Sequence, residues 1–285
     1  MIVFLNGQFV PEEQATVSIF DRGFLYGDGL FETLLVQNGK PFRWTQHLER
    51  LRRGAEFLKI KLPFSPEELQ KFRDDLISRN EMREGLLRLT LSRGVGLRGY
   101  SSNGADRPTL TMTLHPTSQN SSANEIGERW KLMTSSVRLP AGEALAQFKT
   151  CNKLSQILAR AEADDAKVDE ALLLNTDGFV VEGASSNLFW IEHDEVCTPP
   201  LVSGILSGVT RAVVLDICDS LQIKTREVNI TPARLKMAEG VFLSLSSRGV
   251  MEAEFLDGVR LKLSPKIEQI RGAYWNLVQA ETFYE

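Results

Sequence analysis

Four turn dipeptides constrain the fold of this chain more than any other feature of its sequence. An Asn or Asp followed by Gly occurs at 6–7, 38–39, 177–178 and 257–258, each time next to a run of strand-forming residues. Such a pair supplies the positive φ angles of a tight hairpin turn. Because these turns occur in both halves of the chain, we expect antiparallel strand pairs in both halves, and not a doubly wound parallel sheet.

Apolar residues at helical spacing alternate with these strands and predict four helices. The second helix opens at Pro66, where Ser65 and Glu68 fit a capping box, and the fourth opens at Gly208. The four stripes are Leu48, Leu51, Ala55 and Leu58; Leu69, Phe72, Leu76 and Ile77; Leu154, Ile157, Leu158 and Ala161; and Val209, Val213, Ile217 and Leu221. Strands and helices together predict an α+β (mixed α/β) fold.

One polar segment suggests a division into two domains. Residues 116–125 read PTSQNSSANE, without large apolar side chains, between two strand-like runs. Such a composition is typical of a loop or linker. We therefore predict a small N-terminal domain at 1–117, an interdomain linker at 118–125 and a larger C-terminal domain at 126–285.

Composition excludes several partners. A net charge of −4 and a pI near 5.6 disfavour nucleic acid and anionic membranes, which need a basic surface. The sequence has no apolar stretch of membrane-spanning length, and its start has no basic segment typical of a signal peptide. The three cysteines have no C-x-x-C spacing, which indicates reduced thiols. We therefore expect a cytoplasmic protein.

Several common chemistries have no motif here. The sequence contains no G-x-S-x-G elbow, no P-loop and no G-x-G-x-x-G after a strand. His47, His115 and His193 are scattered without metal-ligand spacing. We therefore expect no metal site, and a serine hydrolase or zinc enzyme is disfavoured.

Three segments suggest a cofactor, although each also has a simpler interpretation. Lys149 precedes an apolar-striped helix, where burial would lower the pKa of its amine and allow it to form a Schiff base; taken alone, it reads as a surface lysine. Glu182 is a lone carboxylate between apolar runs, which needs a cationic partner if it is buried. Residues 203–211, SGILSGVTR, place a Gly/Ser turn before a helix, which suits an anion or a plain N-cap.

Five motifs in order resemble the class IV (fold type IV) pyridoxal-5′-phosphate (PLP) enzymes. They are DRGFLYGDGLFET at 21–33, HLERL at 47–51, Lys149, EGASSNLF from Glu182 and SGVTR from Ser207. This family contains branched-chain aminotransferases, D-amino acid aminotransferases and 4-amino-4-deoxychorismate lyases. The resemblance implies a small and a large α/β domain with PLP between them, assembled as a homodimer.

The resemblance also implies roles for individual residues. Lys149 would carry PLP and move the proton at the reacting carbon. Glu182 would pair with the pyridine nitrogen, and Arg50 would hold the phosphate through a charge-assisted fork.

The remaining phosphate contacts would come from the second half of the chain. The resemblance assigns them to the N–H groups of Val209 and Thr210, with the Thr210 hydroxyl. Ser246 would add a hydroxyl, although the sequence after Ser244 departs from the glycine and threonine common in branched-chain members.

Two further segments bear on the subfamily. SRGVGLRGYS at 92–101 resembles the R-G-x-G-x-R-G-Y-S segment of aminodeoxychorismate lyases, whereas D-amino acid aminotransferases usually carry histidine where this chain has Tyr100. Branched-chain enzymes usually carry glycine where it has Thr33. Arg98 would then anchor a substrate carboxylate, Thr33 would place a hydroxyl near the substrate, and Phe31 and Tyr100 would line the pocket.

The resemblance therefore favours a lyase that forms p-aminobenzoate, a folate precursor, and pyruvate. A D-amino acid aminotransferase is the alternative, and a branched-chain aminotransferase is less favoured. A binding protein that has lost catalysis is disfavoured, because Lys149, Glu182 and Arg50 are all present.

Overall fold

The computed structural model describes residues 1–116 and 128–283, which belong to two compact units. The first unit comprises Met1–Gln119, Phe148–Asn152 and Val278–Glu285, and the second comprises Asn120–Gln147 and Lys153–Leu277. The predicted linker, 118–125, lies outside the described residues. We predicted a larger domain at 126–285. Two parts of that range, Phe148–Asn152 and Val278–Glu285, group with the first unit instead.

The segment Phe148–Asn152 groups with the first unit because its backbone pairs with the start of a strand there. The N–H of Phe31 donates to the carbonyl of Lys149, and the N–H of Cys151 donates to the carbonyl of Gly29, both at 2.9 Å. Hydrogen bonds between residues this far apart in the chain leave no signal in hydrophobic periodicity.

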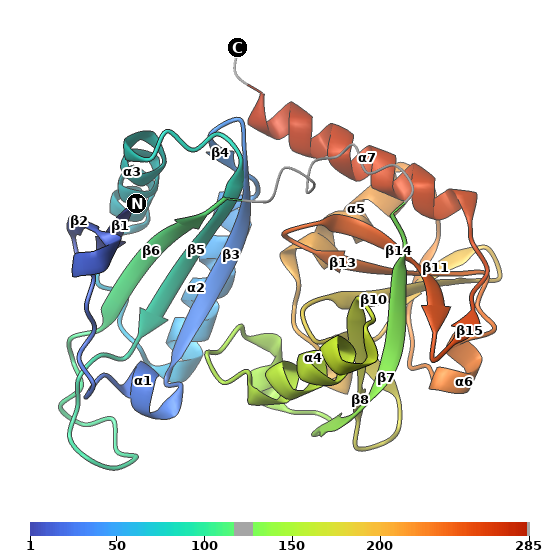
Figure 1. Cartoon of the computed structure of the whole chain (residues 1–285), viewed down its shortest axis with the longest axis horizontal. Coiled ribbons are helices and arrows are strands. Elements are labelled where there is room, and N and C mark those ends of the chain that lie inside the picture. Colours follow the sequence, from blue (N-terminus) through green and yellow to red (C-terminus); the bar gives the residue numbers. More distant parts are fainter. Residues whose placement is uncertain (117–127, 284–285) are drawn as a thin grey trace. The chain divides into compact units, whose positions relative to one another are not determined.

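An antiparallel sheet of six strands forms the first unit, in the order β2-β1-β6-β5-β3-β4 (Figure 1). Helices α2 and α3 pack against this sheet. The strands are β1 (Ile2–Leu5), β2 (Gln8–Pro11), β3 (Gly29–Gln37), β4 (Lys40–Pro41), β5 (Gly85–Ser92) and β6 (Thr109–His115), and the helices are α1 (Arg22–Tyr26), α2 (Trp44–Leu58) and α3 (Pro66–Arg79). The predicted capping box of α3 is present, since Ser65 Oγ accepts from the N–H of Glu68 and Glu68 Oε2 accepts from the N–H of Ser65.

Alternation along β3 gives its two faces different roles. Leu30 and Leu34 join Leu51 and Ala55 of α2 in one buried core, as expected for side chains that alternate across a strand. Phe31 follows Leu30 directly along β3 and therefore lies on the opposite face of the sheet.

Three of the four predicted turns are two-residue hairpin loops. Asn6-Gly7, Asn38-Gly39 and Asp257-Gly258 all have positive φ at both positions and join β1 to β2, β3 to β4, and β14 to β15. The fourth differs: Asp177 is not among the positive-φ residues, and the loop is longer, with the N–H of Asn175 donating to the carbonyl of Phe179. The prediction of a tight turn with two positive φ angles is wrong there, because Asn175 Oδ1 accepts from the N–H groups of Asp177 and Phe179 and stabilises a wider loop.

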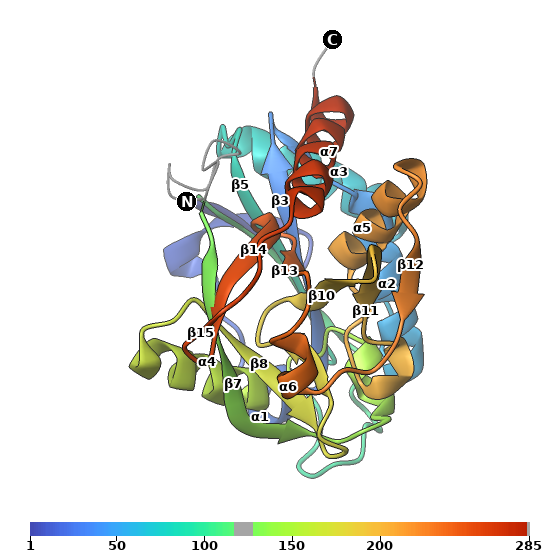
Figure 2. The same ribbon diagram turned by 90° about the vertical axis from the view of Figure 1, so that its right-hand side faces the viewer.

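The second unit is built on a nine-stranded sheet that closes on itself. Strands β10, β13, β14, β7 and β8, which are labelled in Figure 2, pair in succession. Strand β9 follows β8 and pairs back with β10 through Glu182 and Asn187. The strands are β7 (Trp130–Leu139), β8 (Glu170–Asn175), β9 (Val180–Gly183), β10 (Asn187–Glu192), β11 (Glu195–Thr198), β12 (Thr225–Glu227), β13 (Gly240–Leu245), β14 (Gly249–Leu256) and β15 (Val259–Arg260). Antiparallel pairs occur in both units, as expected, for example β3–β5 and β13–β14, whereas the pairs β7–β8, β7–β14 and β11–β12 are parallel.

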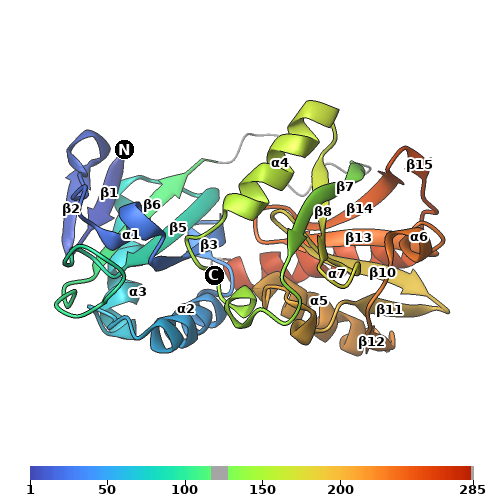
Figure 3. The same cartoon turned by 90° about the horizontal axis from the view of Figure 1, so that it is seen from below.

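Four helices accompany this sheet: α4 (Leu154–Ala166), α5 (Val209–Ser220), α6 (Pro232–Leu235) and α7 (Pro265–Thr282). Figure 3 shows α4 and α5 on opposite sides of the strands of the second unit. In α5 the predicted stripe is buried at Val213 and Ile217. In α4 the predicted stripe instead faces outward, because the small residues Ala159 and Ala163 pack on the sheet and leave Leu154, Ile157 and Leu158 exposed.

Within residues 1–116 and 128–283, no helix combines the length and the apolar character needed to cross a bilayer.

Candidate active site

Lys149 lies on the face of the first sheet that points away from its helices. Thr150 forms an isolated bridge with Leu30, which brings Lys149 to the start of β3. Its Nζ is 4.5 Å from the centroid of the Phe31 ring, a distance typical of a cation–π contact. The two residues that the sequence assigned to covalent chemistry and to the pocket wall are therefore in contact.

Arg88 contacts the same ring and was not identified from the sequence. Its guanidinium carbon lies 4.0 Å from the centroid of Phe31, and in the β3–β5 register it is paired with Thr33. Burial lowers the pKa of Arg88 below its usual value, and the nearby Cys151 opposes this shift only in part. The sequence did contain a sign of it. Arg88 is the one arginine in the strand GLLRLTLS, at a position where alternation directs the side chain away from the core.

Phe31, Thr33, Arg88 and Lys149 thus share one face of the sheet. Side chains that are directly opposite in an antiparallel pair lie on the same face, about 5 Å apart at Cβ. Thr33 and Arg88 are such a pair, and Phe31 is two residues from Thr33 along β3. An amine, a hydroxyl and a guanidinium therefore surround one aromatic ring, which suits an amine substrate that carries a carboxylate.

On the opposite face, Glu32 is held between two basic residues of α2. Arg50 donates from Nε to Glu32 Oε1 at 2.8 Å and from Nη2 to Oε2 at 2.6 Å, and His47 Nδ1 lies 2.7 Å from Oε2. All three side chains are buried. Burial would raise the pKa of Glu32, but the charge and hydrogen bonds of Arg50, with a smaller contribution from His47, lower it to about 2.

The same cluster keeps His47 neutral over a wider pH range. Burial lowers the pKa of His47; the Glu32 carboxylate raises it, and the charges of Arg50 and Lys149 lower it further. The sequence assigned Arg50 to the phosphate and gave no role to Glu32 or His47. Glu32 lies in the motif FET and His47 in HLERL. The contact between them could not be read from the sequence.

In the second unit, Glu182 is buried at the end of β9. Its Oε2 accepts a hydrogen bond from the N–H of Leu206 at 2.9 Å. A second carboxylate, Glu170, is fully buried and accepts from the N–H and Oγ of Ser185 and from Oγ of Ser186. Glu170 thereby stabilises the turn that follows Glu182, a role that the sequence did not reveal.

The N-terminus of α5 forms the candidate anion site. Gly208 is its N-cap and provides no side-chain hydrogen bond, and Val209 and Thr210 are the first residues of the helix, both buried. Thr210 Oγ1 lies 3.4 Å from Ser246 Oγ. A Cβ at Gly208 would lie 1.9 Å from Asn187 Oδ1, so any other residue would displace the Asn187 amide.

Arg98 and Tyr100 lie apart from these groups, on the loop that follows β5. Both side chains are exposed, Tyr100 by 90%, and the Tyr100 ring contacts that of Tyr26 at 5.6 Å between centroids. The predicted site residues thus occupy five places: the face of β3 and β5 with Lys149, the α2 side of that sheet with Arg50, the end of β9 with Glu182, the α5 N-terminus with Ser246, and this loop.

The residues present fit PLP. A lysine amine on an aromatic ring suits its aldehyde, a buried carboxylate suits its pyridinium nitrogen, and a helix N-terminus beside two hydroxyls suits its phosphate. In the described part of the chain, no group of three or more His, Cys, Asp or Glu side chains could hold a metal ion.

Curated relatives carry three different names. The chain is 33% identical to a "Putative branched-chain-amino-acid aminotransferase" of Methanocaldococcus jannaschii, covering 95% of this chain and 96% of that protein. It is 28% identical to the D-alanine aminotransferase of Bacillus licheniformis over 99% of both chains. It is 32% identical to the aminodeoxychorismate lyase of Bacillus subtilis, covering 79% of this chain and 76% of that one.

The fold and a family model agree with these relatives. The branched-chain aminotransferase of Thermoproteus uzoniensis, solved with norvaline, superposes with a TM-score of 0.91 at 28% identity, covering 98% of this chain and 95% of that one. Another branched-chain amino acid aminotransferase, solved with pyridoxamine 5′-phosphate, superposes with a TM-score of 0.91 at 28% identity. The model of the family described as amino-transferase class IV matches residues 29–254. The chain therefore belongs to the class IV aminotransferase family and is an enzyme that depends on PLP.

Proposed function

We propose that this enzyme is a 4-amino-4-deoxychorismate lyase, which releases p-aminobenzoate and pyruvate. The observation that carries the proposal is the group around Phe31, in which Lys149, Thr33 and Arg88 share one face of the sheet. Aminodeoxychorismate carries one amine and two carboxylates, and would engage two cations besides the lysine. Arg88 supplies one, and Arg98, which the lyase-like segment SRGVGLRGYS contains, supplies the other.

Each residue then has a defined task. PLP, when bound, supplies an electron sink for the carbon that bears the amine. Lys149 would hold PLP and remove the proton from that carbon, and the Thr33 hydroxyl would hydrogen-bond the reacting end of the substrate. The ring C–O bond to the enolpyruvyl group would then break as the electron pair of the lost C–H bond enters the ring, which becomes aromatic, and the released enolpyruvate would take up a proton to give pyruvate.

The cofactor contacts are part of the same proposal. Arg50, oriented by Glu32, binds the phosphate together with the N–H groups of Val209 and Thr210. Ser246 adds a hydroxyl beside Thr210. Glu182 pairs with the pyridine nitrogen, which keeps that nitrogen protonated.

We also infer that the enzyme is a cytoplasmic homodimer. Three large apolar side chains on α4, Leu154, Ile157 and Leu158, are between 59% and 73% exposed, and exposed apolar patches commonly mark protein interfaces. Light scattering of the purified protein measures the mass directly, and the inference predicts twice that of one chain. A monomer at micromolar concentration would contradict it.

D-amino acid transamination is the second candidate, and one observation favours it. The D-alanine aminotransferase of Bacillus licheniformis matches this chain over 99% of its length, a greater coverage than the lyase relative has. Lys149 would then move the proton of the amine-bearing carbon without cleavage of an enolpyruvyl group, and the product would be a keto acid. Branched-chain transamination, the activity in the name of the Methanocaldococcus jannaschii relative, is third.

Product analysis separates these activities. PLP-loaded protein is supplied with enzymatically generated aminodeoxychorismate, and p-aminobenzoate and pyruvate are followed together. Equal amounts of both, absent with Lys149→Ala, are expected for the lyase. If neither forms, the lyase is excluded, and keto acid formation from D-alanine or D-glutamate, then from branched-chain L-amino acids, identifies the transaminase.

A further inference from the structure

The loop after β5 presents its side chains outward. Leu97 is 74% exposed, Tyr100 is 90% exposed and Arg98 is exposed as well. Burial of these side chains therefore cannot define the conformation of the loop. Gly99 has a φ of +106°, a region that side-chain-bearing residues rarely adopt, so the conformation is specific nonetheless.

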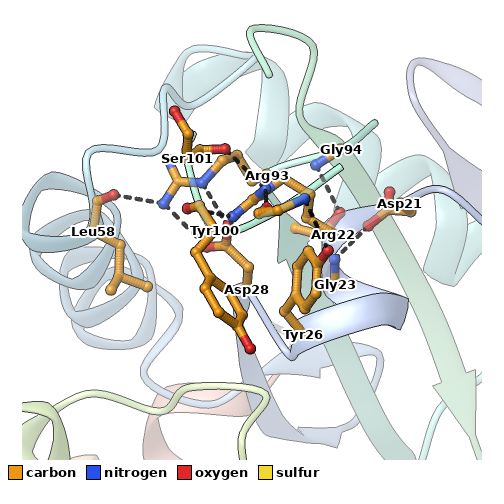
Figure 4. Close-up of polar contacts among 12 residues, drawn as sticks. Asp21, Arg22, Gly23, Tyr26, Asp28, Leu58, Arg93, Gly94, Tyr100 and Ser101 are labelled. Carbon is orange, nitrogen blue, oxygen red and sulfur yellow. Dashed lines mark hydrogen bonds and ion pairs between the residues drawn. The ribbon is translucent and has the colours of Figure 1, made fainter. Parts of the chain in front are cut away.

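Arg22 holds this loop through the backbone of three successive residues (Figure 4). Its Nη1 donates to the carbonyls of Gly99 at 2.9 Å and Ser101 at 3.0 Å, and its Nη2 donates to the carbonyl of Tyr100 at 3.1 Å. The Arg22 side chain is only 5% exposed. One buried guanidinium thus anchors the segment on which the exposed side chains are displayed.

Arg22 is itself oriented by a partly buried carboxylate, Asp28. Its Nε donates to Asp28 Oδ2 at 2.8 Å, and Arg93 donates to both oxygens of Asp28, at 2.7 and 3.0 Å. Burial would raise the pKa of Asp28, but the hydrogen bonds and charges of Arg93 and Arg22 lower it overall. Asp28 is therefore ionised at neutral pH and can orient both guanidinium groups.

Arg93 ties the cluster to the end of α2. Its Nη2 donates to the carbonyl of Leu58 at 2.8 Å, and its Nη1 donates to the carbonyl of Lys59 at 3.0 Å (Figure 4). The same α2 carries Arg50 of the predicted phosphate site. Arg22, Asp28 and Arg93 thereby connect the loop to α2, the helix that also carries a predicted cofactor contact.

We propose that Arg22 is a positioning residue for substrate binding, which fixes the backbone at 99–101 so that Arg98 meets a substrate carboxylate in one geometry. This inference rests on the proposed function in one respect, the assignment of Arg98 as a carboxylate anchor. Lysine cannot replace Arg22, because its single ammonium group lacks the planar set of donors that reaches Asp28 and three carbonyls at once.

The test is a double-mutant cycle between Arg22→Lys and Arg98→Ala, with aminodeoxychorismate as substrate, or D-alanine if the wild type transaminates it. We expect Arg22→Lys to raise KM by about ten- to a hundred-fold, the range for a misplaced binding group, and to change kcat little. In the Arg98→Ala background, Arg22→Lys should add almost nothing, because the group it positions is gone.

Two further variants separate positioning from folding. Gly99→Ala perturbs the positive-φ position without touching the core, since nothing lies within 4 Å of its added Cβ, and it should raise KM in the same way. Arg73→Lys removes another buried arginine of the first unit, one that pairs with Asp74 and stacks on Trp44, and it should leave KM unchanged.

Hydrogen exchange of the amides at 97–101 gives a readout independent of turnover. Arg22→Lys should speed exchange there, and Arg73→Lys should not. Three results would each overturn the proposal. They are an unchanged exchange rate at 97–101 in Arg22→Lys, an equal rise in KM from Arg22→Lys with and without Arg98, and a normal KM for Arg98→Ala. A wild type that converts no amine, with exchange still dependent on Arg22, would contradict the proposed function and leave the hold of Arg22 on the loop established.

Discussion

The PLP contacts predicted in the two units are of different physical kinds. In the first unit they are basic side chains, Lys149 and Arg50, and Glu32 orients Arg50. The second offers mainly the backbone N–H groups at the start of α5, with the Thr210 and Ser246 hydroxyls beside them. A charged side chain is lost with one substitution, whereas a helix N-terminus keeps its N–H groups when a side chain changes. We therefore expect point substitutions to be more damaging in the first unit.

The largest effect is expected at Lys149. Lys149→Ala removes both the attachment point for PLP and the group that moves the proton, so turnover should fall by at least about a thousand-fold. PLP should still bind non-covalently, without the absorbance change that borohydride causes in the wild type. Lys61→Ala, an exposed lysine in the same unit, is the matched control, and near-normal turnover of Lys149→Ala would refute the assignment.

Glu32→Gln comes next, because it leaves Arg50 buried without its counter-ion. Breaking a buried ion pair by removing one partner costs about 3–5 kcal/mol, which urea unfolding would detect. Glu49→Gln, which breaks the exposed pair with Arg52, should have little effect. Equal stability of the two variants would mean that the buried cluster contributes no more than a surface pair.

The same cluster predicts a dependence of stability on pH. The pKa of Glu32 is lowered from 4.5 to about 2, so its contribution is complete above pH 4.5 and is lost as the pH falls toward 2. The pKa of His47 is also lowered, from 6.5, so protonation of the unfolded chain reduces stability as the pH drops below 6.5. Urea unfolding of wild type and Glu32→Gln across this range should show a flatter profile for the variant below pH 4.5, and parallel profiles would contradict the assignment.

Arg50→Ala should weaken the retention of PLP. A hydrogen bond to a charged group contributes about 1.5–3 kcal/mol, which corresponds to roughly ten- to a hundred-fold in the PLP dissociation constant. Equilibrium dialysis at known PLP concentrations would measure it. An unchanged constant would place the phosphate contact elsewhere.

Thr210→Val should have the smallest effect of the set. It removes one hydroxyl and keeps the N–H groups at the start of α5, so a loss of about 0.5–1.5 kcal/mol in PLP affinity is expected. Ser246→Ala removes the neighbouring hydroxyl and should behave alike. If either variant lost more PLP affinity than Arg50→Ala, the expectation that substitutions are more damaging in the first unit would be wrong.

Local features were predicted well because they depend on neighbours in the chain. The capping box at Ser65 and Glu68, the helices α2 and α3, and three hairpin turns all follow from dihedral preferences and spacing. The failures have one common cause. The exposed stripe of α4 and the wider turn at Asp177-Gly178 depend on which atoms pack nearby, and periodicity does not contain that information.

The sequence by itself determined which residues are candidates to bind the cofactor, since the motifs with Lys149, Glu182 and the α5 N-terminus can be read in order along the chain. Only the tertiary structure decided what those residues contact. It paired Thr33 with Arg88 across two strands, and it brought Gly99–Ser101 to Arg22 from more than 70 residues away in the chain. Such contacts arise because strand register and burial bring distant residues together, and neither is encoded at any single position.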